Sequence, residues 1–122
     1  MKLFEKIMQH LDLFTALTSA TKALLVSAQK QRVDLVGEIT DNRDRLINVI
    51  KTLQTSIEDD IAALKPCDVT KEQVEIIKTW GQEINQIVTM NDKLDRECML
   101  LLEQQKEDTT KEIATVFTNH QA

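Results

Sequence analysis

The stretch that decides the fold is KPCDVTKEQV, residues 65–74. The Lys65-Pro66 pair disfavours helix, because the proline ring restricts the residue before it. Thr70 and Gln73 then have the spacing of a capping box, in which each side chain binds the other residue's backbone N–H. Val69 and Val74 flank that box at the positions of a hydrophobic staple. The sequence therefore predicts a reversal of the chain at residues 66–69 and a new helix from about residue 70.

Upstream of this reversal, residues 34–65 have the pattern of an amphipathic helix. Two neighbouring rows of apolar residues recur every seven positions, which is typical of a seam that packs against another helix. The rows are Ile39, Leu46 and Leu53, and Ile50, Ile57 and Leu64.

Residues 2–31 predict a first helix with a wide apolar face, including Phe4, Ile7, Leu11 and Phe14. We expect a tight turn at residues 31–34, with Asp34 capping the second helix.

Downstream, residues 70–118 predict a third helix that packs antiparallel on the second. Its apolar residues again lie in two rows, one through Ile77 and Ile84 and the other through Trp80 and Ile87, and Gly81 is expected to allow close helix approach. Residues 103–112 contain no apolar side chain, and an apolar tip at residues 113–117 follows. This tip could project past the bundle, fold back, or belong to a short fourth helix capped by Thr109.

Composition supports a single helical-bundle domain spanning residues 1–122. The chain has only two glycines and one proline, so it has few places to turn, and the predicted fold class is all-α with three long antiparallel helices. Its net charge is -5 and no Lys/Arg block is present, which argues against nucleic acid as a partner. The N-terminus lacks the apolar core of a signal peptide, and the longest apolar run is residues 98–102. We expect a cytoplasmic protein without membrane insertion and with reduced cysteines.

No sequence motif indicates catalysis. The phosphate-binding, metal-ligating and nucleophile patterns are absent, so we predict that the chain is not an enzyme and has no catalytic residue, metal site or cofactor. His10 is the one candidate for phosphoryl transfer on a helical bundle, but the lysine and glycine that usually accompany such a histidine are missing.

Arg43 and Asn91 are polar residues in apolar rows. They either fix the helix register or, for Arg43, bind a partner's carboxylate.

The segment DLVGEITDNRDRLI, residues 34–47, resembles the start of the second helix in flagellar type III export chaperones of the FliT and FlgN kind. The shared features are an acidic and apolar lead followed by Arg, an acid and a Leu-Ile pair. More loosely, the resemblance covers nearly the whole chain, through a helical hairpin and a long last helix containing Asn91-Asp92 and Leu94.

The resemblance implies a cytosolic chaperone for protein export. Such a chaperone binds the terminal amphipathic helix of a flagellar filament-cap or hook-associated subunit, keeps that subunit monomeric and export-competent, and contacts components of the export apparatus. In this family the end of the last helix helps to control the binding groove. We therefore predict a partner-binding site with three parts, which are the groove residues Leu35, Ile39, Leu94, Cys98, Leu101 and Leu102, the anchor Arg43, and the tip residues Ile113, Val116 and Phe117.

A second hypothesis, from a different class, is a structural helical-bundle or coiled-coil adaptor. In that case the projecting tip would mediate self-association, for example as a homodimer, and no flagellar subunit would be a client.

Overall fold

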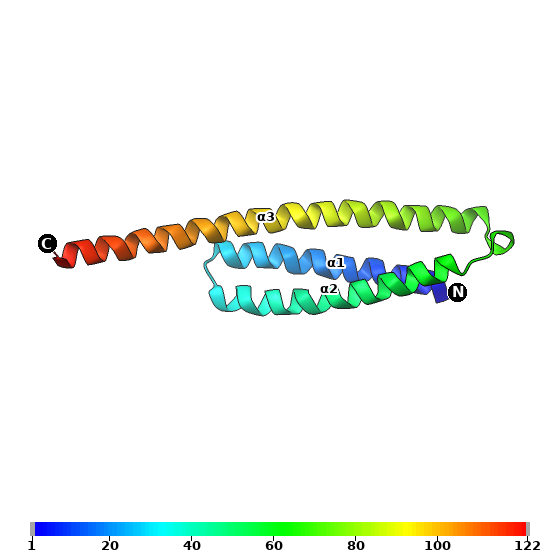
Figure 1. Cartoon of the computed structure of the whole chain (residues 1–122), viewed down its shortest axis with the longest axis horizontal. Helices are drawn as coiled ribbons and strands as arrows, with labels where there is room; N and C mark the ends of the chain where they lie inside the picture. The colour runs from blue at the N-terminus through cyan, green and yellow to red at the C-terminus, as the bar shows by residue number, and fades with distance from the viewer. Residues whose placement is uncertain (1, 122) are drawn as a thin grey trace.

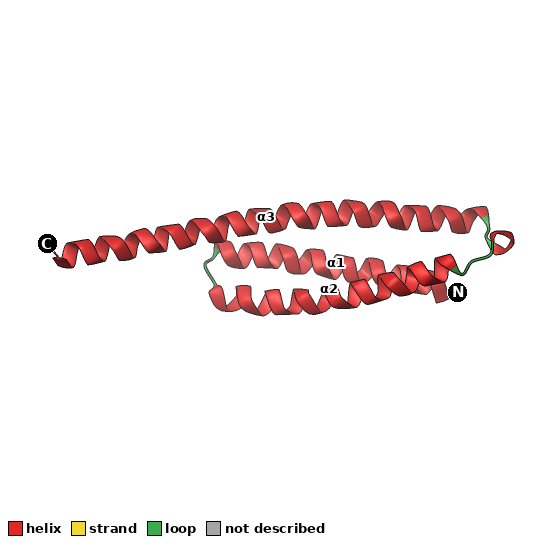
Figure 2. Cartoon of the chain, viewed as in Figure 1, coloured by secondary structure: helices red, strands yellow, loops and turns green. Residues whose placement is uncertain are grey.

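The computed structural model describes residues 2–121, with side chains through residue 119, and is built from three long α-helices. Helix α1 spans Lys2–Gln29, α2 spans Val33–Ala62 and α3 spans Lys71–Gln121, with one 3-10 turn, η1, at Pro66–Asp68. The all-α prediction is confirmed, and both turns form where they were predicted (Figures 1 and 2).

The reversal before α3 is closed by the predicted capping box. The amide N–H of Gln73 donates to Thr70 Oγ1 at 3.1 Å, and the amide N–H of Thr70 donates to Gln73 Oε1 at 3.0 Å. Two of the N–H groups that a helix start leaves without a partner are thereby satisfied. The staple residues Val69 and Val74 lie together with Pro66 around a small apolar depression at this end.

The turn between α1 and α2 is a Schellman motif. Gln31 adopts a left-handed conformation, with φ of 57°. The N–H of Arg32 donates to the Ser27 carbonyl at 2.9 Å, and the N–H of Gln31 donates to the Ala28 carbonyl at 3.1 Å. These bonds satisfy carbonyls that the end of a helix leaves free. The motif usually places glycine where this chain has Gln31, so the turn carries some backbone strain.

The predicted cap of α2 by Asp34 is wrong. Helix α2 begins one residue earlier, at Val33, and its N-cap position is held by Arg32, which makes no side-chain capping bond. Asp34 lies inside the first turn and accepts from Arg32 Nη2 at 3.1 Å. A carboxylate in a first turn still favours the helix dipole, although it no longer acts as a cap.

Helix α1 is the centre of the bundle. Apart from Ser27, its buried residues follow one another at alternating intervals of four and three, the spacing of a heptad seam. This row is Leu3, Ile7, His10, Phe14, Leu17, Thr21, Leu24 and Ala28. The residues of α2 and α3 that complete the three core clusters all pack against it.

The expected direct packing of α3 on α2 is only partly realised. The two helices run in opposite directions, but among the described residues no Cα of α2 lies within 8 Å of a Cα of α3. Their side chains still meet, for example where Ile57 and Trp80 share a cluster with Leu3 and Ile7. The difference arises because α1 fills the space between them.

Helix α3 continues well past the turn that joins α1 and α2 (Figure 1). Its 51 residues extend about 77 Å, against about 45 Å for α2. Thr109 lies inside this continuous helix, and its hydroxyl donates to the Gln105 carbonyl at 3.0 Å. No fourth helix is present within residues 2–121, so that alternative is wrong. We call residues 106–121, about 24 Å of helix, the overhang.

Gly81 does not mark a close helix approach, contrary to the prediction. A methyl group built at this position meets no heavy atom within 4 Å, and the same is true of Gly37 in α2. Both glycines therefore weaken their helices without a packing reason.

Gln31→Gly should stabilise the protein, because glycine adopts the left-handed conformation without a Cβ clash. We expect the free energy of unfolding, measured by urea denaturation, to rise by about 0.5–1 kcal/mol. Ala23→Gly, at an ordinary exposed position of α1, is the matched control and should lower it by about 1 kcal/mol. A loss of stability in Gln31→Gly would show that the turn is not left-handed.

Gly81→Ala should raise the free energy of unfolding by about 0.5–1 kcal/mol, since alanine restricts the unfolded chain and meets open space in the folded one. Thermal unfolding followed by circular dichroism measures this. Gly37→Ala is an independent second case, and a drop in melting temperature in the Gly81 variant alone would reveal close packing at that site.

Candidate partner-binding site

A buried histidine, His10, lies in the seam of α1, in the first third of that helix. His10 is 0% exposed, and its Nδ1 accepts a hydrogen bond from Trp80 Nε1 at 3.1 Å. The imidazole also makes edge contacts with the rings of Phe14 and Trp80, with centroid distances of 4.9 and 5.5 Å. This arrangement joins α1 to α3 and supplies the partner that a buried indole N–H needs.

The surroundings of His10 favour its neutral form. Burial lowers its pKa below 6.5, and the Ile50 carbonyl and the charge of Glu58 oppose this shift without reversing it. Because Nδ1 accepts from Trp80, the neutral ring carries its proton on Nε2, a buried atom without a well-aligned acceptor among the described residues. In this conformation neither ring nitrogen is open to solvent or to a phosphoryl donor.

Two polar contacts lie further along the bundle. Asn91 is buried, and its Nδ2 donates to Thr18 Oγ1 at 3.0 Å and to the Ile87 carbonyl at 2.9 Å. Arg43 is largely buried, with 13% of its side chain exposed, and its Nη2 lies 2.9 Å from Asp95 Oδ2. The carboxylate that Arg43 was predicted to bind is therefore supplied by α3 of the same chain, and both polar residues join helices.

Three of the six predicted groove residues lie in the core or pack against it. Cys98 is 3% exposed and packs with Leu24 and Ala28 of α1, and burial raises the pKa of its thiol. Ile39 and Leu101 pack against the same cluster. Leu35 and Leu94 are half-buried, and Leu102 is 36% exposed. Helix α1 thus occupies the position that was predicted for a partner helix.

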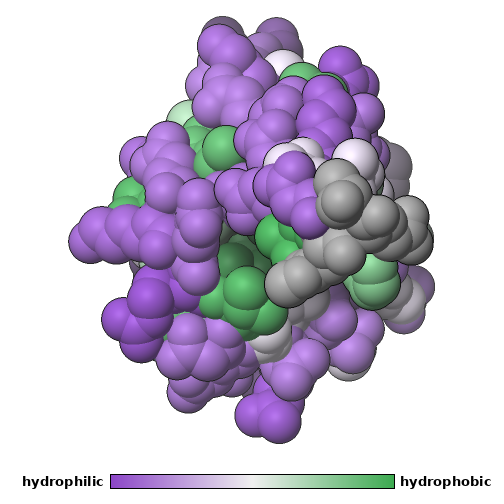
Figure 3. Space-filling model, turned by 90° about the vertical axis from the view of Figure 1, so that its left-hand side faces the viewer, coloured by the Kyte–Doolittle hydropathy of each residue, from purple (hydrophilic) through white to green (hydrophobic). Residues whose placement is uncertain are grey.

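The predicted tip residues are exposed. Ile113, Val116 and Phe117 are 53%, 55% and 64% exposed. The last two follow Ile113 by three and four positions, so all three lie on one side of the overhang. The view onto the end of the molecule where the C-terminus lies shows hydrophobic side chains within a mostly hydrophilic surface (Figure 3). Large apolar side chains gathered in this way are typical of a protein-binding surface.

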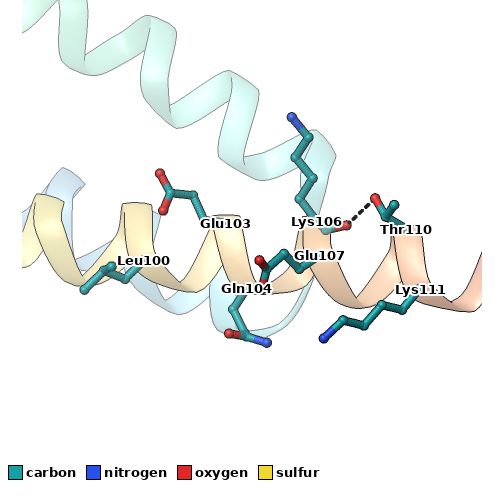
Figure 4. Close-up of a pocket in the computed structure, with 7 residues that line it drawn as sticks. All are labelled: Leu100, Glu103, Gln104, Lys106, Glu107, Thr110 and Lys111. Atoms are coloured by element: carbon teal, nitrogen blue, oxygen red, sulfur yellow. Dashed lines mark hydrogen bonds between the residues drawn. The ribbon is translucent and has the colours of Figure 1, made fainter.

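A shallow depression lies at the base of the overhang. It is lined by residues of α3 alone, from Leu100 to Lys111, and most of them are charged or polar (Figure 4). The Thr110 hydroxyl donates to the Lys106 carbonyl at 2.9 Å within it. A surface on one helix encloses no ligand, so this depression is better understood as part of the face along which another helix could lie.

Three further residues of this region lie outside the predicted site. Met99 and Leu100 are 62% and 67% exposed beside the predicted groove, and Met99 continues the face of the tip toward the bundle. Gln105 Nε2 donates to the Ala28 carbonyl at 2.7 Å and joins α3 to the end of α1. The sequence already shows Met99 and Leu100 as apolar residues in excess of the one apolar stripe that the last helix needs, whereas no pattern pairs Gln105 with the end of α1.

Comparison with protein-family models, with curated proteins and with solved structures finds no match to this chain. By length and composition α1 could cross a membrane, a property that it shares with core helices, and its apolar face lies in the bundle core. Among the described residues, no group of three or more His, Cys, Asp or Glu side chains is placed to hold a metal ion. The site is therefore defined by its geometry, as an exposed apolar face on a projecting helix.

Acid should destabilise the bundle through His10. Because the pKa of the folded state is below 6.5, the stabilising effect of the neutral ring is complete above pH 6.5. As the pH falls below 6.5 toward the lowered pKa, it is lost at about 1.4 kcal/mol per pH unit. His10→Gln, whose amide oxygen can still accept from Trp80, should remove this component. Urea denaturation at pH 7, 6 and 5, followed by the fluorescence of Trp80, measures it.

Equal pH dependence in the parent and in His10→Gln would contradict a buried neutral imidazole.

Proposed function

We propose that this chain is a helix-binding export chaperone of the flagellar type III kind. Its client would be the terminal amphipathic helix of a filament-cap or hook-associated subunit, which it would keep monomeric and export-competent in the cytoplasm. The observation that carries the proposal is the overhang, a preformed helix with Ile113, Val116 and Phe117 more than half exposed.

The geometry favours a helix as the ligand. Apolar side chains at intervals of three and four fit between those of a second amphipathic helix, which is a common mode of peptide recognition. The overhang and the exposed Met99 together offer a long, narrow face and no enclosed cavity. A small molecule would bury little of its surface on such a face, whereas a helix could pack along its whole length.

The resemblance of residues 34–47 to flagellar export chaperones is the reason for proposing a flagellar subunit as the client. Those residues form the first half of α2, which has no fully buried side chain before Ile50. The predicted groove would open only if this half of α2 separated from α1, so the tip is the surface available to a client without rearrangement. The role of Arg43 in the proposal changes accordingly, since its partner Asp95 would have to be displaced first.

The double variant Val116→Asp/Phe117→Asp should lose client binding, because it places two charges in the apolar contact. Labelled peptides copying the terminal helices of filament-cap and hook-associated subunits, measured by fluorescence anisotropy, are the probes. We expect at least one to bind the parent chain, with binding weakened by at least about 100-fold in the variant.

Thr115→Asp/Thr118→Asp is the matched control, since it adds the same charge to the opposite side of the overhang and should leave binding unchanged. Both variants should melt within a few degrees of the parent chain because the replaced side chains are exposed. Failure of every peptide to bind the parent chain would contradict the proposed function.

A further inference from the structure

Helix α3 carries a row of exposed side chains at heptad spacing. Six positions recur at intervals of three and four from residue 99 to residue 116, which is the spacing of a coiled-coil interface. All six side chains are exposed, and the apolar ones range from 36% to 62% exposure. We call this row the outer seam, and it consists of Met99, Leu102, Lys106, Thr109, Ile113 and Val116.

The order of residues in the outer seam is the same from either end. Two apolar residues come first, two polar residues follow, and two apolar residues complete the row. If two copies lie antiparallel with the midpoint between Lys106 and Thr109, Met99 of each copy faces Val116 of the other. In the same register Leu102 faces Ile113, and Lys106 faces Thr109. Every apolar residue then meets an apolar residue, so the seam is complementary to itself.

Charge selects the antiparallel orientation. A parallel pair in register would place Lys106 against Lys106, and like charges that face each other in an interface are strongly unfavourable. The antiparallel register places each Lys106 beside a threonine. At the flanking positions Gln105 faces Glu112 and Glu103 faces Thr110, so no two like charges meet.

The two bundles lie on opposite sides of the centre of this pairing. Gln105 Nε2 donates to the Ala28 carbonyl near the end of α1, and the midpoint of the register lies further along α3, between residues 107 and 108. The two bundles therefore lie toward opposite ends of the paired helices. Each tip reaches the exposed Met99 and Leu102 of the other copy, beside the end of its α1.

We propose that two copies of this chain associate through their outer seams as an antiparallel, end-to-end dimer. The seam is short, and an interface of about 1,000 Å² is at the lower limit for a stable complex, so the dimer forms reversibly and depends on concentration. The inference does not rest on the proposed function. Where both hold, a second copy and a client helix compete for Ile113 and Val116.

Sedimentation velocity of the full chain over a range of concentrations tests the dimer. We expect reversible dimerisation in the parent chain and in Thr115→Asp/Thr118→Asp. In Val116→Asp/Phe117→Asp the association should be weakened by at least about 100-fold, with helix content by circular dichroism unchanged. A parent chain that stays monomeric at every concentration, or a dimer that Val116→Asp/Phe117→Asp leaves intact, would overturn the proposal.

Disulfide trapping tests the orientation. In a Cys67→Ser background, which removes the exposed thiol, Leu102→Cys and Ile113→Cys chains are oxidised separately and as a mixture. The antiparallel register predicts cross-links between the two variants and none within either one. Cross-linking of each variant with itself would indicate a parallel pair and overturn the register.

The two proposals fail separately. A dimer that binds none of the flagellar peptides contradicts only the proposed function, whereas a monomer that binds one of them contradicts only the dimer. If both hold, saturating peptide should convert the dimer into a one-to-one complex in the same sedimentation experiment.

Discussion

The contact of α1 with both other helices is the interaction on which this structure depends. Helix α2 has only two fully buried side chains, Ile50 and Ile57, and each packs against residues of the α1 seam. The buried residues of α3 are also spread along that seam, from Trp80 to Cys98. Because α2 and α3 approach each other only through side chains, neither would be held in place without α1. The bundle therefore cannot open between α2 and α3 without losing contacts to the central helix.

Polar groups within this interface determine how the helices align. The Thr21 hydroxyl donates to the Leu17 carbonyl within α1, so it needs no hydrogen-bond acceptor on another helix. His10, Asn91 and Arg43 instead bind groups on another helix, Trp80, Thr18 and Asp95. A buried polar group that loses its partner costs more than an apolar group that shifts, so these contacts penalise any slip of one helix along another. Three buried atoms of the same residues have no partner among the described residues, which limits their net contribution to stability.

The sequence was sufficient to predict the helices and their turns, because proline, the capping box and heptad spacing are local signals. It did not identify α1 as the central helix. The true seam of α1 contains His10 and Thr21, and a search for apolar residues alone passes over them and selects Phe4 and Leu11, which are only partly buried. Cys98 was assigned to a groove for a similar reason: periodicity shows that a residue faces a helix, but not whether that helix belongs to the same chain.

The exposed tip was predictable because a polar spacer followed by apolar residues has no partner within so short a chain. What the sequence left open is whether α3 stays continuous, as it does. The helix has no proline or glycine after Gly81, and each residue added to an existing helix avoids the cost of nucleation. A partner that binds the overhang therefore meets a helix that is already formed, and little conformational entropy remains to be lost. Because the overhang makes no core contact, its exposed surface can change by mutation without changing the stability of the bundle. The proposed binding surface is thus separated from the folded core by the difference in length between α3 and the other helices.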